Sequence, residues 1–286
     1  MNATVDHVLL TRFNLPSVGV ESTVRAHEGW LRQRVALFER YCLPSVMAQD
    51  TQDFHWISYF DPESPSWLRH RIAEWESASA LTPVFRESVS HGELMDDLHH
   101  LTGGRRQQLL TTNLDNDDGL AGDFVSRLQR MPAAGPRSAL YFSRGLIKHG
   151  SAVYLRTDRD NAFCSVRENW EAPLGCWADW HNRLGLHMPV VEISGQPAWL
   201  QVIHDLNVSN RIHGRRVAPD PYLPAFGALL EDAAGTSRRD VVMDAVWNAP
   251  RRAARETLRA AVKKSVMTVA GKEGLDRFKA GLAARK

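Results

Sequence analysis

The first half of the chain alternates short runs rich in β-forming residues with stretches whose apolar residues recur at helical spacing. The β-rich runs span 7–13, 54–60, 81–85 and 107–114, and helical spacing appears over 30–41 and from Trp67 to Trp75. Strands that alternate with helices of this length are typical of a parallel sheet with crossover connections. The pattern therefore predicts an α/β fold.

Beyond residue 114 the pattern is less regular. A helix is predicted over 120–130, and strands are predicted over 138–143, 152–156 and 199–204. Residues 90–104 are mixed and favour neither type of element. Pro44 predicts the end of the helix that begins near Trp30, because proline normally interrupts a helix.

Composition narrows the class of protein. With 286 residues, of which 43% are hydrophobic, the chain can bury one large core or two small ones. The formal net charge is only +2, which argues against a nucleic-acid partner for the chain as a whole. The N-terminus lacks a signal peptide and no apolar run approaches 18 residues, so we expect a cytoplasmic protein. The three cysteines lack the spacing of a zinc site and are expected to be reduced and buried.

The C-terminal segment differs from the rest in charge. Residues 251–286 hold eleven Lys or Arg and three acids, a net +8, so the other residues sum to −6. Leu258, Val262, Val266 and Val269 recur at helical spacing beside these basic residues. The segment is either a solvated helix packed on its own domain or a weak, charge-driven contact with an anionic membrane.

An acidic cluster directly follows the strand at 107–114. Asp115 and Asp117 are two residues apart, so their side chains point the same way at the end of an extended strand. In open α/β sheets this end of the strands is where ligands bind, and two carboxylates can hold a divalent ion that contacts phosphate. The alternative is a solvated loop in which Asp115 or Asp118 caps the next helix. A calcium-binding EF-hand is excluded because Leu114 and Val125 would occupy ligand positions.

Five segments together resemble a known family. They are HVLLTRFNLPS at 7–17, LFERYCLPSV at 37–46, FHWISYFDPESP at 54–65, TTNLDNDDGL at 111–120 and WLQVIHDLNVSNRIHG at 199–214. In this order they resemble the bacterial rhamnosyltransferase family of GT-A-like, nucleotide-sugar-dependent glycosyltransferases. The resemblance implies a Rossmann-like mixed sheet flanked by helices and a nucleotide-diphosphate sugar as donor, with rhamnose as the leading sugar.

The resemblance also implies roles for individual residues. Thr11, Arg12 and Phe13 would line the nucleotide pocket, Asp61 would accept a hydrogen bond from the base, and Asp115 would contact the ribose or the metal ion. Asp117 would be the main ligand of Mn²⁺ or Mg²⁺, His204 would complete the metal or diphosphate site, and Asp118 would lie near the sugar or hold the loop. Position 113 departs from the family, since relatives are expected to have Arg where this chain has Asn113. Arg105 or Arg106 would then supply the missing contact.

An inverting transfer also needs a general base to take the proton of the acceptor hydroxyl. Asp179 and Glu168 are the candidates, although either acid could equally be a helix cap or part of a surface ion pair. Trp177 and Trp180 are three residues apart and fit one helical face, either as core residues or as a surface that stacks on an acceptor sugar.

The sequence thus predicts a GT-A-like glycosyltransferase domain over 1–225 and a helical, basic extension over 226–286. The expected reaction is metal-dependent transfer of a sugar to a glycan or lipid-linked acceptor, with possible peripheral membrane contact through 251–286. Two alternatives stay open: a metal-dependent nucleotide-sugar hydrolase or nucleotidyltransferase, and a non-catalytic protein that binds nucleotide sugars.

Overall fold

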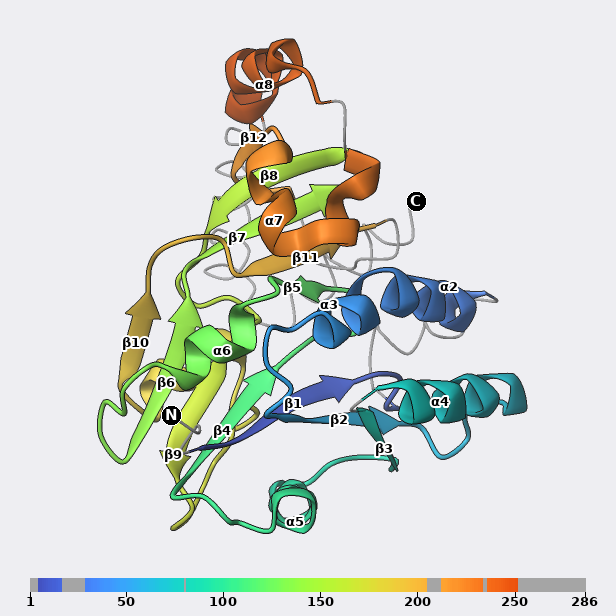
Figure 1. Cartoon of the computed structure of the whole chain (residues 1–286), viewed down its shortest axis with the longest axis vertical. Coiled ribbons are helices and arrows are strands. Elements are labelled where there is room, and N and C mark those ends of the chain that lie inside the picture. The colour runs from blue at the N-terminus through green and yellow to red at the C-terminus, as the bar shows by residue number, and fades with distance from the viewer. Residues whose placement is uncertain (1–4, 17–28, 80, 205–211, 234–235, 252–286) are drawn as a thin grey trace, which may run out of the picture.

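A computed structural model describes residues 5–16, 29–79, 81–204, 212–233 and 236–251 of the chain. Within these ranges the chain forms two mixed sheets with helices on their faces (Figure 1). The predicted α/β class is confirmed.

The larger sheet has seven strands in the order β10-β6-β9-β4-β1-β2-β3. Their bounds are β1 Val5–Arg12, β2 His55–Phe60, β3 Leu81–Phe85, β4 Gln108–Asn113, β6 Arg137–Phe142, β9 Ser165–Asn169 and β10 Val190–Ile193. Strands β1, β2, β3 and β4 are parallel to one another, whereas β9 is antiparallel to both β4 and β6. The carboxyl ends of β1, β2, β3 and β4 therefore meet along one edge.

Alternating apolar side chains of β1 explain why helices cover both faces of this sheet. Leu9 packs in one cluster with α2 (Trp30–Leu37), η1 (Phe38–Cys42), α3 (Leu43–Met47), α4 (Ser66–Ala78) and α6 (Phe124–Gln129). Val8 and Leu10 face the other way, towards α5 (His91–Thr102) and the 3₁₀-helix η2 (His181–Leu186). Both faces are buried, as expected for parallel strands.

The smaller sheet has five strands in the order β12-β8-β7-β11-β5. Their bounds are β5 Gly119–Leu120, β7 Arg144–His149, β8 Ala152–Thr157, β11 Trp199–Ile203 and β12 Arg215–Val217. Helices η3 (Asp220–Tyr222), α7 (Leu223–Phe226) and η4 (Gly227–Ala233) follow, and Phe226, Leu229 and Leu230 pack in the core of this sheet. Helix α8 (Arg238–Met243) and the π-helix η5 (Asp244–Asn248) come last.

A glycine in the smaller sheet makes room for a large side chain of the neighbouring strand. A Cβ at Gly145 in β7 would lie 2.0 Å from the Trp199 ring, so only glycine leaves room for this indole. Trp199 stacks on Phe163 with ring centroids 5.1 Å apart, and its Nε1 donates to the Phe142 carbonyl. The stacked pair fixes one wall of the site described below.

Several predicted elements need correction. Pro44 does not end the first helix, because it lies in the first turn of α3, where its missing N–H costs nothing. Residues 90–104, predicted to be mixed, contain α5, which begins with a capping box between Ser90 and Glu93. Trp177 and Trp180 do not share a helical face, since residues 176–179 form turns.

Three further predictions concern the cysteines, the division into domains and the basic C-terminal segment. The cysteines Cys42, Cys164 and Cys176 are free and buried, as expected. The division at residue 225 stays a prediction, and most of the basic segment, residues 252–286, lies outside the described ranges. In the ranges that are described, no helix is both long and apolar enough to cross a membrane.

Candidate active site

The acidic turn that follows β4 is held in place from three sides. Asn116 donates through Nδ2 to the Phe13 carbonyl at 2.7 Å, which ties the turn to the end of β1. Arg34 of α2 donates through Nη1 to Asn116 Oδ1 at 3.0 Å. The Val202 N–H of β11 donates to Asp118 Oδ1 at 2.8 Å, so Asp118 joins the turn to the smaller sheet. The turn is thereby fixed against both sheets.

Asp117 lies between two potential cations. Its Oδ2 is 2.6 Å from Arg34 Nη1 and 2.9 Å from His204 Nε2. Burial alone would raise the pKa of Asp117, but the hydrogen bond from His204 and the charge of Arg34 outweigh burial and lower it. Asp117 is therefore held as a carboxylate.

Asp115 and Asp118 have the opposite tendency. Burial raises the pKa of Asp115, and the negative charge of Asp117 raises it further. Burial also raises the pKa of Asp118 well above its usual value, with Asp117 and Asp115 adding to the effect. The turn thus concentrates negative charge that a bound cation would relieve.

A chain of contacts connects Asp115 to Arg12 at the end of β1. Asn113 Nδ2 donates to Asp115 Oδ1 at 3.3 Å, and Asn113 Oδ1 accepts from Trp177 Nε1 at 2.7 Å. The guanidinium carbon of Arg12 lies 4.0 Å from the centre of the Trp177 ring, a cation–π contact. Burial lowers the pKa of Arg12, but a guanidinium stays protonated in proteins. Arg12 thus presents a fixed positive charge beside the acids.

Arg12 and Trp177 form a wall shared by two cavities. The smaller, of about 310 Å³, lies by β1, the segment after β3 and α5, and is lined by Arg12, Val89, Ser90, His91, Leu94, Leu174, Trp177, Ala178 and His187. The larger, of about 620 Å³, has Asp115, Arg156, Asp158, Asp179, Trp180 and Gln201 among its lining residues. Both open at the carboxyl edge of the parallel strands, where ligands of open α/β sheets bind.

A family model with the description "Putative rhamnosyl transferase" matches residues 6–216. The chain belongs to this family. The resemblance to the rhamnosyltransferase family seen in the sequence is confirmed. The predicted α/β class with a mixed sheet flanked by helices agrees with the observed topology.

Solved structures similar to this family member are distant in sequence. TarS from S. aureus is 9% identical over 70% of this chain, with a TM-score of 0.42. TarS 1–349 in complex with UDP is 7% identical over 84% of this chain and 69% of its own, with a TM-score of 0.41. The inositol-1-phosphate CTP transferase from T. maritima is 9% identical over 82% of this chain and 98% of its own, with a TM-score of 0.38. The chain spans 37% of the length of the first TarS structure. No curated protein matches the chain.

Of the three residues predicted to line the nucleotide pocket, the structure places only Arg12 at a cavity. Thr11 is buried in the sheet, where its Oγ1 accepts from Trp56 Nε1 at 3.0 Å. Phe13 is buried against Phe38 and Phe60. Adjacent side chains of a strand point to opposite faces, so three consecutive residues could not all face one pocket.

Glu168, one of the two predicted bases, is better explained as a structural residue. It is fully buried in β9, and its carboxylate accepts from Arg137 Nε at 2.6 Å and from the backbone N–H groups of Leu174 and Gly175. Glu168 pairs with Leu109, near the amino end of β4, and is absent from the lining of both cavities. Its charge stabilises a loop rather than serving the cavity.

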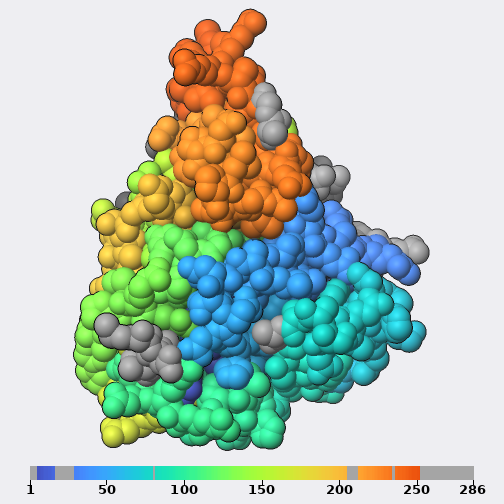
Figure 2. Space-filling view, viewed as in Figure 1, coloured from blue at the N-terminus to red at the C-terminus, as the bar shows by residue number. Residues whose placement is uncertain are grey.

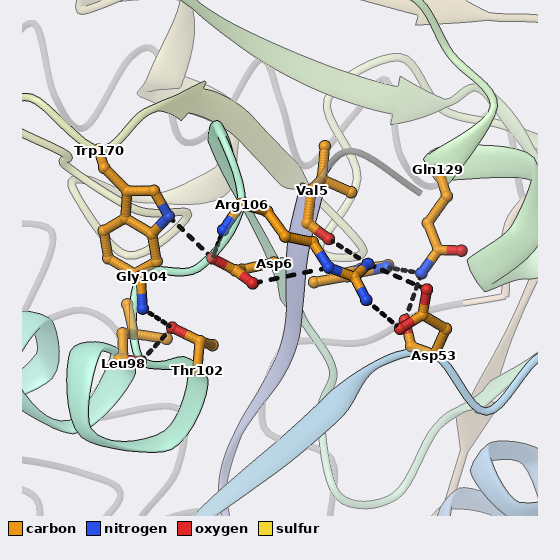
Figure 3. Close-up of polar contacts among 10 residues, drawn as sticks. Val5, Asp6, Asp53, Leu98, Thr102, Gly104, Arg106, Gln129 and Trp170 are labelled. Carbon is orange, nitrogen blue, oxygen red and sulfur yellow. Dashed lines mark hydrogen bonds and ion pairs between the residues drawn. The ribbon is translucent and has the colours of Figure 1, made fainter. Parts of the chain in front are cut away.

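Arg105 and Arg106 lie at the wrong end of β4 to replace the arginine expected at position 113. They precede β4, whereas the cavities lie at its carboxyl end. Arg106 instead donates to Asp53 and to the Val5 carbonyl, next to Asp6 (Figure 3). The six residues of β4 separate the two ends by about 20 Å. The cations that the structure places near the acidic turn are Arg12, which lines the larger cavity with Asp115, and Arg34, which contacts Asp117.

Asp179 lines the larger cavity, as a base for an acceptor hydroxyl must. Its Oδ2 lies 2.9 Å from His187 Nε2 and 3.7 Å from Arg183, and its Oδ1 accepts from the Trp180 N–H. The hydrogen bond from His187 is the main cause that lowers the pKa of Asp179. Its role as the base stays a prediction.

Asp158 is a further acid in the same cavity, beside Asp179 and Asp115, and it was not predicted from the sequence. It follows β8, and its carboxylate accepts from Arg156 Nη2 at 2.9 Å. Only the strand end at Thr157 could have indicated it, since an acid directly after a strand resembles the position of Asp115.

Asp61 follows β2 at the same edge of the sheet. Its backbone N–H donates to Asn14 Oδ1 at 3.1 Å, and its Oδ1 accepts from the Glu63 N–H at 2.8 Å. These contacts fix the loop, but they do not test whether Asp61 recognises a base. That role stays a prediction.

Proposed function

We propose that this glycosyltransferase binds a nucleotide-diphosphate sugar across the wall formed by Arg12 and Trp177. The nucleoside would occupy the smaller cavity, and the sugar and acceptor would occupy the larger one. One observation carries the proposal: two cavities of about 310 and 620 Å³ share Arg12 and Trp177 beside Asp115. A donor with two dissimilar halves joined by a diphosphate fits two cavities joined at a cation.

The smaller cavity has the chemistry that a nucleoside requires. Leu94, Leu174 and Trp177 offer apolar surface to a base, while Ser90 and His91 offer polar groups. Asp61 stands at the end of the adjacent strand β2, where it is proposed to accept a hydrogen bond from the base.

The diphosphate would lie beside Arg12, with Arg34 close to the acids. Charge develops on the leaving diphosphate when the bond to the sugar breaks, and preorganised cations stabilise that charge. Arg12 is held by its contact with Trp177, and Arg34 is held by Asp117 and Asn116. Neither guanidinium needs to reorganise during the reaction, which is the condition for electrostatic catalysis.

A divalent cation is part of the proposal. The oxygen and imidazole donors of Asp117 and His204 suit Mn²⁺ or Mg²⁺, and Asp115 is close enough to feel the charge of Asp117. In the described part of the chain, no three His, Cys, Asp or Glu side chains form a metal-binding group. Further ligands would therefore come from the diphosphate. When bound, the ion would neutralise the charge of the leaving diphosphate.

The larger cavity is proposed to hold the reacting groups. The acceptor hydroxyl oxygen attacks the anomeric carbon, the bond to the diphosphate breaks, and Asp179 or Asp158 takes the hydroxyl proton. Trp180, which is 73% exposed, offers an aromatic face to an acceptor sugar. Rhamnose as the donor sugar and a glycan or lipid-linked acceptor complete the proposal.

Substitution of both acids tests which one is the base. Asp179→Asn and Asp158→Asn are close in shape to the native residues but cannot accept the proton. The base variant should lose turnover by about two to three orders of magnitude and retain donor binding. The other variant serves as the matched control, and equal modest losses in both would remove the general-base assignment.

The donor is tested by thermal unfolding and calorimetry. Nucleoside diphosphates and their sugars, screened with and without Mn²⁺, should include one that raises the melting temperature through mass action. Asp117→Ala should reduce metal-dependent diphosphate affinity at least tenfold, about 1.4 kcal/mol. Unchanged affinity would remove the metal assignment, and sugar release to water with no acceptor product would make the chain a hydrolase.

A further inference from the structure

The last described helix carries an apolar face towards solvent. Val242, Met243, Val246 and Trp247 are 59%, 47%, 58% and 53% exposed. Residues spaced by one, four and five positions lie on one side of a helix, so the four form one surface, here called the α8–η5 face. An exposed apolar cluster of this kind marks an interaction site more often than a scattered residue does.

The helix that bears this face is anchored to the rest of the molecule from its other side. Asp244 is buried, and a capping box between Ser237 and Asp240 fixes the start of the helix. The helix lies against β12 and projects beyond the two sheets, as the tip at the top of Figures 1 and 2 shows. A projecting, anchored helix can reach a flat surface without displacing the domain.

The charges next to the α8–η5 face are predominantly basic. Arg238 and Arg239 begin α8, and Arg251 lies over the Trp247 ring at 5.7 Å. Of the acids on the helix, Asp240 is engaged in the capping box and Asp244 is buried. The sequence continues with the +8 segment at 251–286.

We propose that the α8–η5 face docks on an anionic lipid surface. Aliphatic residues and a tryptophan flanked by arginines are the composition of a helix that lies in the membrane interface. A second copy of the chain would bring one +8 segment near another, so repulsion disfavours self-association through this face. A lipid surface of negative charge satisfies both the apolar and the basic residues.

The proposal changes what the sequence predicts for the membrane contact. The stripe at 258–269 lacks aromatic residues, so charge alone was expected to hold the chain on lipid. The α8–η5 face adds Trp247 and three aliphatic side chains upstream of that stripe. Binding should therefore weaken in salt but retain an apolar component.

Vesicle co-sedimentation of the full chain tests the proposal. The variant Val246→Ser/Trp247→Ser removes the centre of the face, and Leu186→Ser on η2 is the matched control, because Leu186 is 72% exposed but lies outside the helix. The wild type and the control should pellet with vesicles that contain phosphatidylglycerol and stay in solution with phosphatidylcholine alone. The double variant should bind about tenfold more weakly, since it loses two apolar side chains from the interface.

Two further measurements distinguish a lipid surface from a second copy of the chain as the partner of this face. The Trp247 fluorescence, taken as the difference between the wild type and Trp247→Phe, should shift to the blue on anionic vesicles only. A dimer in light scattering that the double variant abolishes would assign the face to a second copy and overturn the proposal. Equal pelleting of the double variant and the wild type would also overturn it, leaving charge alone responsible. None of these readouts requires donor turnover, so failure here is distinct from failure of the proposed function.

Discussion

Buried acids lie beside both ends of strand β4, yet the two ends are built differently. At the amino end, Asp6 accepts from Trp170 Nε1 at 3.0 Å and from the Arg106 N–H, and Arg106 also pairs with Asp53 (Figure 3). At the carboxyl end, Asp115 lines the 620 Å³ cavity, and Asp117 and Asp118 follow it in the same buried turn. The amino end pairs each acid with donors from neighbouring strands, whereas the carboxyl end places acids beside one another.

This difference distinguishes structural from functional charge. A buried acid that has its full set of donors lowers the energy of the fold. A group of acids whose burial and mutual repulsion raise the pKa of Asp115 and Asp118 raises the energy of the empty site. The second arrangement is maintained only if a ligand uses it.

The amino end should control stability alone. Asp6→Ala leaves the Trp170 indole and the Arg106 amide without their acceptor, so the free energy of unfolding should fall by about 3 kcal/mol. Urea unfolding measures the loss, and Asp53→Ala, at a more exposed site, should cost less than about 1 kcal/mol. Diphosphate affinity should stay within about twofold in both variants. A stable Asp6→Ala protein that has lost diphosphate binding would contradict the comparison.

The carboxyl end should control function alone. Asp115→Asn removes repulsion with Asp117, so the free energy of unfolding should not fall. Donor turnover should fall about a hundredfold, which corresponds to about 2.7 kcal/mol. Asp53→Asn serves as the control for removal of one charge. Loss of stability together with retained turnover would show that Asp115 is a structural residue.

His7, which lies in β1, adds a test based on how the free energy of unfolding depends on pH. Burial is the main cause that lowers the pKa of His7 from 6.5 to about 3, and its Nε2 contacts Thr112 Oγ1 at 3.0 Å. The folded state therefore resists protonation, so stability is full above pH 6.5 and falls as the pH drops towards 3. Between pH 7 and pH 5 this group should cost about 2 kcal/mol. His7→Gln, which keeps a hydrogen-bonding group but does not titrate, should unfold with a shallower pH dependence. Identical slopes in both proteins would assign the acid sensitivity to other groups.

Asp61 should produce the smallest effect and the most specific one. Asp61→Ala should reduce discrimination among nucleoside diphosphates by about tenfold, or about 1.4 kcal/mol, without changing the response to Mn²⁺. Competition binding with the four common bases measures the preference. A variant with the same ranking of bases would exclude Asp61 from base recognition.

The parallel part of the fold could be predicted because each of its strands is a short, continuous run of β-forming residues. The observed bounds of β1, β2, β3 and β4 differ from the predicted ones by two residues or fewer. Strands β5, β7, β9, β10 and β12 were not predicted. Strand β9 shows one reason, because it buries the charged residues Arg167 and Glu168, whereas charged residues are usually exposed. Partners from other parts of the chain, among them Arg137 for Glu168 and Gln108 for Arg167, stabilise these buried charges, and the fold alone brings them together.

The candidate site was predictable to a similar, limited extent. The spacing of Asp115 and Asp117 indicated the ligand edge, and the family resemblance indicated His204, which contacts Asp117 across 87 positions of sequence. Arg34 could not be found, because nothing local distinguishes it from other charged residues of a helix, and Asp158 had only its position after a strand to indicate it. The contacts that give them a role exist only in three dimensions.

The wall formed by Arg12 and Trp177 separates two parts of the site whose lining residues can be substituted independently. No residue of the five-stranded sheet lines the 310 Å³ cavity. The 620 Å³ cavity, in contrast, is lined in part by Arg156, Trp199 and Gln201 of that sheet. On the proposed assignment, substitutions in the smaller sheet would change the acceptor while the nucleotide requirement was inherited intact. Members of the family could thus differ in the acceptor they use while they keep the same contacts with the donor.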